Sequence, residues 1–572
     1  MGIKLTYCLA TLLLFFSINL NAQGDPINLE AQGNREVPKA TRIAESPLIQ
    51  DTATPSQVMD YPSLNLYFPT QIELRKIEAA SVKIVDKLPQ LYHSYLKLGV
   101  GSKFMPLGEF YFNNIRSRKY HYGVNLKHLS SFGNISEYAP AGFDRTRGEI
   151  FGSIIENRYQ VNGSFHYGSQ GLHYYGFKND SIDKDSIRQR YNDVGFHFDF
   201  LRERKDTTNL NFKVGLTYNN FMSRKLGDAD SLKNWRAREN FFVIDGGAWY
   251  KMGKEIYSAD LSISYNGYKY GEELKTLTPI DSGLVRDNTV ISLKPRITTF
   301  AYDNRLKASV GLDLTIDAAD KTKAYIYPLV EAKYSLFNDI FIPYVGIKGG
   351  LTQQSFRNFT SENEFILPNI EIINEHKAID LYGGFKGTIS RRIGFNIGAS
   401  FAHIKNLSFY LSDTLHARQN QFYLGYDTAN VATIEGSMYF QLREKLRIDV
   451  IGKYNSYQLL NNSYAWNRPS TEFTVRGKYN LFDKLIAQVD LNLQGGRKAL
   501  VFEDGVDTKL ENGQYGLSLG YLADANLGLE YLYNNRISAF FQMNNLAAQR
   551  YKRWNNYPVM GFQVMGGFTF KF

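Results

Sequence analysis

The chain has 572 residues and a formal net charge of +10, but it has no run of five or more basic residues, which argues against nucleic-acid binding. Its single cysteine, Cys8, lies inside the N-terminal leader described below, so disulfides and thiol catalysis are excluded for the rest of the chain. Hydrophobic residues make up 43% of the sequence, a value that suits both a soluble protein and a membrane barrel, in which only every second strand residue faces lipid.

Aromatic side chains are abundant, at 15% of the sequence, with 40 Tyr and 39 Phe but only 4 Trp. Outer-membrane barrels place aromatic girdles at both membrane interfaces. Tyrosine suits that depth because its ring is apolar and its hydroxyl stays hydrated. The aromatic excess therefore favours a membrane barrel, and the pattern along the chain must decide.

Residues 1–22 have the parts of a secretory signal peptide. Lys4 supplies the positive charge, residues 9–18 form an apolar stretch, and Ala22 is the small residue before the expected cleavage point. Cys8 precedes the apolar stretch, which argues against a lipoprotein anchor. The alternative, a transmembrane anchor, would need a longer apolar stretch. We therefore expect a leader that is removed on export.

Residues 23–90 form a polar segment interrupted by prolines. Scattered prolines interrupt helices and strands, so we expect a mostly irregular segment that is periplasmic or crosses the lumen of a barrel. Deleting it should open conductance if it fills a pore, and release a partner if it docks one.

From Leu91 to the C-terminus, apolar and polar residues alternate with the period of a strand that has one apolar face. One apolar set is Leu306, Ala308, Val310, Leu312, Leu314 and Ile316, and the residues between them are Lys307, Ser309, Gly311, Asp313 and Thr315. A soluble β-sandwich also alternates, but its strands average about five or six residues, and the runs here are about twice as long or longer. Their length favours a membrane barrel.

The connections alternate in length, as in bacterial barrels with short turns at one end and long loops at the other. Short turns are expected at Arg116–Lys119, Glu156–Arg158, Arg204–Asp206, Gly253–Glu255, Asp303–Asn304, Asn338–Asp339, Ser390–Arg392, Arg443–Lys445, Phe482–Lys484 and Asn534–Arg536. Longer links are expected at 131–144, 271–285, 354–375, 407–428 and 498–520. The sequence predicts an all-β fold, a transmembrane antiparallel β-barrel of about 22 strands over residues 91–572, after a short irregular N-terminal periplasmic segment.

The last predicted strand carries an aromatic row to the end of the sequence, because Phe568, Phe570 and Phe572 share one face. An ordinary buried edge strand is the alternative, but an exposed row of Phe in water would promote aggregation. A terminal aromatic on a lipid-facing row is similar to the signal read by the barrel-assembly machinery. We expect these three residues to form that assembly signal.

Two parts of the chain resemble TonB-dependent receptors. The stretches similar to the last three strands of that family are Asn526-Leu527-Gly528-Leu529-Glu530-Tyr531, Met543-Asn544-Asn545-Leu546, Tyr551 and Gly566-Gly567-Phe568. Residues 91–99, Tyr122-Gly123 and His128-Leu129-Ser130-Ser131 are similar to plug-poor relatives in Bacteroidota, where signal ends such as Ala22-Gln23 are common.

This resemblance implies a Gram-negative outer-membrane protein that acts as a solute channel or receptor, with the long loops setting access. The family carries a much longer N-terminal plug than residues 23–90 could form, and no convincing TonB box is present. A reduced plug also fits an alternative, a non-transporting subunit of an outer-membrane machine for barrel assembly or protein secretion. A barrel this wide needs something in its lumen.

The histidines offer no enzyme or metal site. His121 and His128 are seven residues apart, as are His166 and His173, and an odd separation puts the partners on opposite faces of a strand. We therefore predict no catalytic, cofactor-binding or metal-binding residue, no cofactor and no enzymatic activity.

Charged residues recur at lumen-facing positions, among them Lys127, Lys213 and Lys307. Such charges can set selectivity, and the alternative is hydration and packing against acidic neighbours such as Asp313 and Asp490. The expected partners are outer-membrane lipids and lipopolysaccharide, and the barrel-assembly machinery during insertion. A surface lipoprotein or a larger outer-membrane complex is a further candidate, and nucleic acid is not.

Overall fold

The structure is a computed structural model that describes residues 91–179, 181–202, 210–225, 235–270, 287–319, 321–413, 418–442, 445–501, 508–509 and 515–572. The predicted signal peptide and the 23–90 segment lie outside the described residues. The part described belongs to one compact unit, Lys87–Phe572. No helix within these ranges is both long enough and apolar enough to span a membrane.

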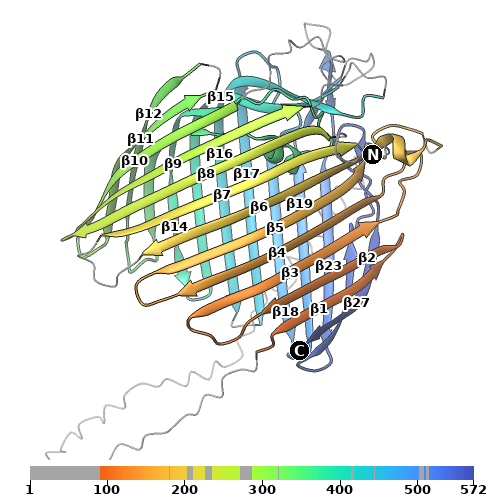
Figure 1. Ribbon diagram of the computed structural model, residues 1–572, viewed down its shortest axis with the longest axis horizontal. Coiled ribbons are helices and arrows are strands. Elements are labelled where there is room, and N and C mark those ends of the chain that lie inside the picture. The colour runs from red at the N-terminus through yellow and green to blue at the C-terminus, as the bar shows by residue number, and fades with distance from the viewer. Residues whose placement is uncertain are drawn as a thin grey trace, which may run out of the picture. The chain divides into compact units, whose positions relative to one another are not determined.

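The fold is a closed antiparallel barrel of 22 strands (Figure 1). The wall strands are β1 (Ser94–Gly101), β2 (Met105–Asn113), β3 (Tyr120–Ser131), β4 (Phe143–Ile155), β5 (Gln160–His173), β6 (Arg188–Arg202), β7 (Asn211–Lys225), β8 (Trp235–Met252), β9 (Glu255–Tyr270), β10 (Asp287–Ala301), β11 (Leu306–Ala318), β12 (Lys323–Tyr334), β13 (Ile342–Thr352), β14 (Glu375–Ser390), β15 (Ile393–Ser412), β16 (Phe422–Leu442), β17 (Leu446–Leu459), β18 (Thr471–Leu481), β19 (Leu485–Gly495), β23 (Leu522–Leu532), β24 (Ile537–Asn544) and β27 (Gln563–Lys571). Strand β1 pairs with both β2 and β27, which closes the barrel. The predicted fold class and strand number are confirmed.

Short turns join the strands at the end of the barrel where β1 begins and β27 ends, which we call the turn end. The opposite end is the loop end. Asp303, Asn304 and Phe482 have left-handed φ angles of 53°, 66° and 53°, as tight turns often require. Both of these turns lie where the sequence predicts them, whereas Arg204–Asp206 and part of Arg443–Lys445 lie outside the described residues.

One of the predicted long links is wrong. Strand β15 continues to Ser412 and β16 begins at Phe422, so most of the predicted loop 407–428 is strand. The pairing of β15 with β16 shifts register between Ile404 and Leu407. That shift breaks the alternation of apolar and polar residues, which is why the strand is not recognisable from its period.

Small elements occupy the other loops of the loop end. The predicted loop 354–375 contains the short helix α3 (Phe356–Glu362). The predicted loop 498–520 contains a three-stranded sheet of β20 (Lys498–Val501), β21 (Thr508–Lys509) and β22 (Tyr515–Ser518). The last loop carries the paired strands β25 (Lys552–Trp554) and β26 (Tyr557–Pro558).

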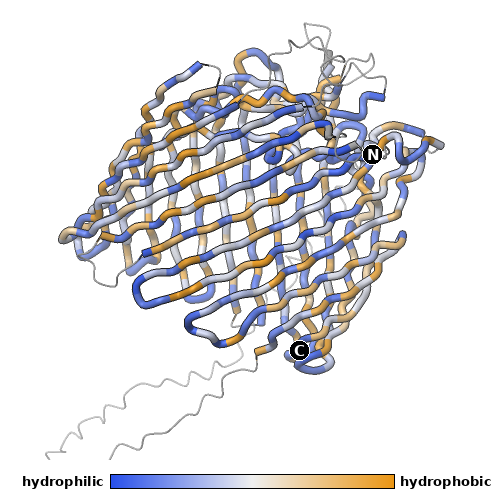
Figure 2. The backbone as a smooth tube through the Cα atoms, in the orientation of Figure 1, coloured by the Kyte–Doolittle hydropathy of each residue, from blue (hydrophilic) through white to orange (hydrophobic). Residues whose placement is uncertain are grey.

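The outer face of the wall is apolar. Leu261, Leu293, Leu314 and Ile326 lie directly opposite one another on β9 to β12, and their side chains are 43%, 40%, 36% and 72% exposed. Figure 2 shows the same alternation of apolar and polar residues along the strands. An outward-facing apolar band of this kind suits contact with lipid.

The inner face is polar and internally paired. On β11, the buried carboxylate of Asp313 accepts hydrogen bonds from Ser292 Oγ at 2.8 Å and Thr315 Oγ1 at 2.6 Å. Lys294 Nζ lies 3.2 Å from the other oxygen of the same carboxylate. A buried charge is tolerated where its hydrogen bonds are made in this way.

Candidate functional site

The segment between β13 and β14, residues 353–374, folds inward at the loop end, and we call it the crossing loop. Its helix α3 begins after Ser355, whose side chain accepts a hydrogen bond from Asn358 N at 3.0 Å. Serine is a favoured residue at this position because its oxygen satisfies a free backbone N–H group of the first turn.

Glu239 of β8 fixes the start of α3 from the barrel wall. Its buried carboxylate accepts hydrogen bonds from Phe356 N at 2.8 Å, Arg357 N at 2.9 Å and Asn266 Nδ2 at 2.7 Å. A carboxylate at the first turn of a helix is favourable because the N–H groups there carry partial positive charge. These bonds also compensate the cost of burying the charge.

Two ion pairs tie the crossing loop to strands on the far side of the lumen. Arg357 donates to Asp193 Oδ2 of β6 through Nη2 at 2.7 Å and Nε at 3.0 Å. Arg145 Nη2 of β4 lies 2.8 Å from Glu364 Oε2, and Gln170 of β5 donates to the same oxygen. Because β13 and β14 stand seven or more strands from β4 to β6 in the wall, the loop spans the lumen.

Aromatic rings pack around the crossing loop. The buried residues of this cluster include Tyr174, Tyr191, Phe221, Tyr268, Phe356, Phe359, Phe365, Tyr410, Phe422, Trp554 and Tyr557. Phe365 stacks on Tyr557 with ring centroids 3.7 Å apart. Such pairs stabilise beyond the area they bury, so the cluster closes this part of the loop end.

Tyrosine hydroxyls satisfy the backbone of the crossing loop. Tyr191 donates to Glu364 O at 3.0 Å, and Tyr174 donates to Ile366 O at 3.3 Å. Burial raises the pKa of Tyr174 and, more strongly, that of Tyr557 in the last loop. Both phenols therefore remain protonated donors over the physiological pH range.

A chamber of about 590 Å³ lies between α3 and the inner face of β3 to β6. Its lining includes four cationic side chains and one carboxylate, namely Lys127, Arg145, Arg147, Arg357 and Asp193. Three of the four cations are paired, because Lys127 also lies 2.8 Å from Glu109. Within the described residues, Arg147 has no ion-pair or hydrogen-bond partner.

The chamber can bind an anion. Arg147 offers a free guanidinium, whose planar donors match carboxylate and phosphate groups. His166 lines the same chamber, and its Nε2 has no hydrogen-bond partner and lies 3.6 Å from Asp193 Oδ2. Arg145 also lines a second cavity of about 450 Å³ near Asp524 and Asn526 of β23.

The structure places the predicted assembly-signal residues on the outer face of β27. Phe568 and Phe572 are exposed there, and Phe570 stacks on Phe572 with centroids 5.3 Å apart. Their role as an assembly signal stays a prediction.

The two histidines of β5 line different cavities and do not form a joint site. His166 faces the chamber, whereas His173 lies 2.5 Å through Nδ1 from Gly142 O and lines the second cavity, near Arg145 and Glu364. Among the described residues, no three His, Cys, Asp or Glu side chains are grouped to hold a metal ion.

Sequence reasoning missed Glu239, Arg357 and Glu364, which build the site. Glu239 shares its face of β8 with Ala237, and both residues are fully buried. In the sequence, however, a single carboxylate in an alternating strand cannot be distinguished from any other charged residue that faces the lumen. The only local signal was Ser355, a helix cap three residues before Asn358.

Comparisons with known proteins show the fold. No protein-family model matches the chain, and no curated protein matches it. Among solved structures, the siderophore receptor PirA from Acinetobacter baumannii is similar with a TM-score of 0.62 at 12% identity, over 85% of this chain and 81% of that one. The ferric-catecholate import receptor Fiu from E. coli gives 0.59 at 10% identity over 85% and 82%. The copper transporter OprC gives 0.58 at 12% identity over 85% and 82%. The structural neighbours are TonB-dependent receptors.

Proposed function

We propose that this chain is an outer-membrane transport barrel of the TonB-dependent-receptor type, and that it binds an anionic solute in the chamber beside α3. The observation that carries the proposal is the unpaired Arg147 in a cation-lined chamber under a loop that crosses the lumen. The apolar outer wall and the likeness in fold to receptors of that type support it. The loop end then faces the cell exterior, and the turn end faces the periplasm.

The mechanism follows from the contacts of the crossing loop. An incoming anion that reaches Arg147 also competes with Asp193 for Arg357 and with Glu364 for Arg145. Hydrogen bonds to charged groups contribute about 1.5–3 kcal/mol each. If both arginines exchange their ion pairs with Asp193 and Glu364 for bonds to the solute, the crossing loop is released at little net cost in free energy. Solute binding is thereby coupled to opening of the lumen.

A negatively charged metal chelate is the solute class we propose. Several neighbours are named as siderophore, ferric-catecholate or copper transport proteins, and a cationic chamber suits such a chelate when its ligands are catecholates or carboxylates. The signal peptide, a Bacteroidota source and docking of a surface lipoprotein stay predictions from the sequence.

Equilibrium dialysis of the purified full chain tests the proposal. The probe is the tris-catecholate complex of Fe(III), a trianion, and the matched probe is the neutral tris-acetohydroxamate complex. We expect the trianion to bind more tightly and R147Q to weaken it, while K213Q, on the inner face of β7, leaves it unchanged. Equal binding of the two complexes, or no effect of R147Q, would contradict an anion site in the chamber.

Copurification from gently solubilised outer membranes tests the rival function. A barrel recovered alone, or with only a surface lipoprotein, supports transport. Stoichiometric recovery with assembly or secretion proteins would instead identify a subunit of an outer-membrane machine.

A further inference from the structure

The outer face of β4 to β9 changes in character along the strands. Residues directly opposite one another across neighbouring strands form rows around the wall. One such row runs through Ile150, Phe165, Phe196, Tyr218, Phe242 and Tyr265. Aromatic side chains that face outward in this way suit contact with lipid.

The rows between this aromatic row and the loop end turn polar and then basic. Two residues nearer the loop end, the row is Gly148, Tyr167, Val194, Asn220, Asn240 and Gly267. The next row is Thr146, Ser169, Asn192, Met222, Arg238 and Lys269, and beyond it lie Asp144, Gly171, Arg190 and Arg224. Because side chains alternate across a strand, all of these residues point outward like the aromatic row.

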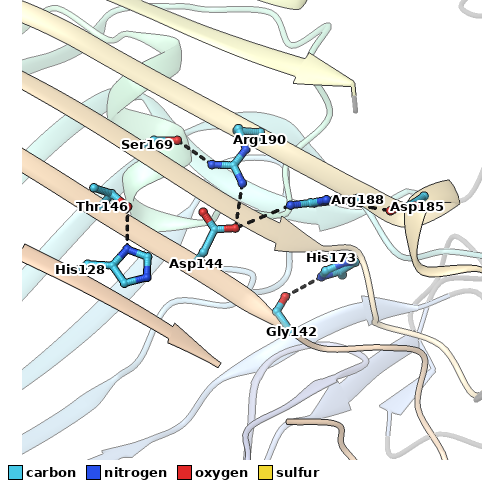
Figure 3. A network of polar contacts seen from close by, with 9 residues as sticks. All are labelled: His128, Gly142, Asp144, Thr146, Ser169, His173, Asp185, Arg188 and Arg190. Atoms are coloured by element: carbon cyan, nitrogen blue, oxygen red, sulfur yellow. Dashed lines mark hydrogen bonds and ion pairs between the residues drawn. The ribbon is translucent and has the colours of Figure 1, made fainter. Parts of the chain in front are cut away.

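Five cationic residues thus gather on the outer wall, and we call them the outer basic patch: Arg188, Arg190, Arg224, Arg238 and Lys269. Figure 3 shows its edge on β4 to β6. Arg190 donates to Asp144 Oδ1 at 2.9 Å and to Ser169 Oγ at 2.7 Å. Arg188 lies 4.0 Å from both Asp144 and Asp185. The two carboxylates thus hold these two guanidinium groups in place.

The other half of the outer basic patch lacks compensation. Among the described residues, the side chain of Arg224 has one polar contact, from Nε to the sulfur of Met222 at 3.2 Å. Arg238 and Lys269 are exposed and directly opposite each other on β8 and β9. In the part of the chain that the structure describes, neither has an ion-pair or hydrogen-bond partner. Like charges directly opposite in a sheet are destabilising unless an anion lies between them.

The outward residues of β11 and β12, in contrast, are apolar along the described parts of both strands. Near the loop end of β11 and β12, the outward residues are Ile316, Ala318, Ala324 and Ile326, and Ile316 and Ile326 are exposed. The outer basic patch of β6 to β9 therefore has no counterpart on the described residues of β11 and β12.

We infer that the outer basic patch binds the phosphate groups of an anionic, multiply acylated lipid of the outer leaflet. Arginine donors match phosphate oxygens in pairs, and Phe196, Tyr218 and Phe242 lie directly below to pack against acyl chains. Arg238 and Lys269 contact the phosphate, and Arg224 adds to the same charge. The inference rests on the proposed outer-membrane location and not on solute transport.

Native mass spectrometry of the full chain in detergent tests the inference. The probes are a bisphosphorylated hexa-acyl lipid A and the same lipid with its phosphates removed. We expect the phosphorylated lipid to remain bound, and the double variant R238Q/K269Q to retain about tenfold less of it, the equivalent of one charge-assisted hydrogen bond. The matched variant K213Q/K307Q removes two charges from the inner face and should retain the lipid as the unmodified chain does.

Three outcomes would overturn the inference. Equal retention of the dephosphorylated lipid would show that acyl contacts alone hold it. Equal losses in both double variants would show a general effect of net charge. Full displacement by millimolar inorganic phosphate would identify a site for free anions. Heat-dependent gel mobility shows whether R238Q/K269Q folds. If it does not, K269Q alone should still retain less of the phosphorylated lipid than the unmodified chain, with a smaller loss than the double variant. Solute binding in the chamber is measured separately, so either proposal can fail without the other.

Discussion

The two faces of β4 to β9 are built from the same strands and obey different rules. On the outer face, the residue class changes along the strands, from the aromatic row to polar and then cationic positions nearer the loop end. On the inner face, single residues such as Glu239 and Asp193 are fixed by contacts with the crossing loop, more than 100 positions away along the chain. The outer face is thus specified by residue class, and the inner face contact by contact.

This difference follows from the two surroundings. Lipid has no hydrogen-bonding groups, so it selects residue classes by depth and is indifferent to identity within a class. A buried polar interior requires partners at specific distances. Substitutions should therefore have graded effects outside and local, all-or-none effects inside.

The largest effect should come from a charge in an apolar row. F198R on β6 is expected to lower the free energy of unfolding in phospholipid vesicles by up to about 4 kcal/mol, because a lipid-facing arginine costs about 2–4 kcal/mol at the bilayer midplane. The neighbouring substitution H197R points inward, toward Thr217 and Asp199, and should cost much less. Similar losses in urea titrations of the two variants would mean that the faces are wrongly assigned.

A large but local effect is expected from E239A. The change leaves Phe356 N, Arg357 N and Asn266 Nδ2 without their acceptor, and each unsatisfied buried group costs about 1–3 kcal/mol. Trypsin should then cleave after Arg357, and conductance in planar bilayers should rise while the barrel stays folded. E239Q keeps one acceptor oxygen, so its tryptic cleavage and its conductance should lie between those of E239A and those of the unmodified chain. Unchanged cleavage would show that the aromatic cluster alone holds the loop.

A smaller effect should come from the ion pair between Arg357 and Asp193. A cycle of R357Q, D193N and the double variant should give a coupling of about 1 kcal/mol, since both side chains are partly exposed to lumen water. Hydrogen exchange of the α3 amides is the measurement. Additive effects in the cycle would mean that the pair does not hold the crossing loop.

The smallest effect concerns selectivity. In the opened E239A background, R147E should shift the reversal potential in a salt gradient toward cations, because it reverses a chamber charge that is unpaired among the described residues. K307E, on the inner face near the turn end, serves as the control for net charge. An equal shift in both variants would locate the selectivity in the whole lumen.

Much of the wall could be predicted from the sequence, and the exceptions have physical causes. The turns Asp303–Asn304 and Phe482–Lys484 were predicted because polar residues interrupt the alternation there. The end of β15 was missed because a register shift after Ile404 hides the period. The outward row of Phe568 and Phe572 followed from the two-residue period alone.

The sequence by itself determined the barrel, its strand number and the face on which each regular strand residue lies, because these depend on a period of two residues repeated along the chain. Only the tertiary structure decided what occupies the lumen at the loop end. The pairs Glu239 with Phe356, Asp193 with Arg357 and Arg145 with Glu364 join residues on different strands and loops. Closure of the barrel brings them together, and no local pattern records which residues meet across a lumen.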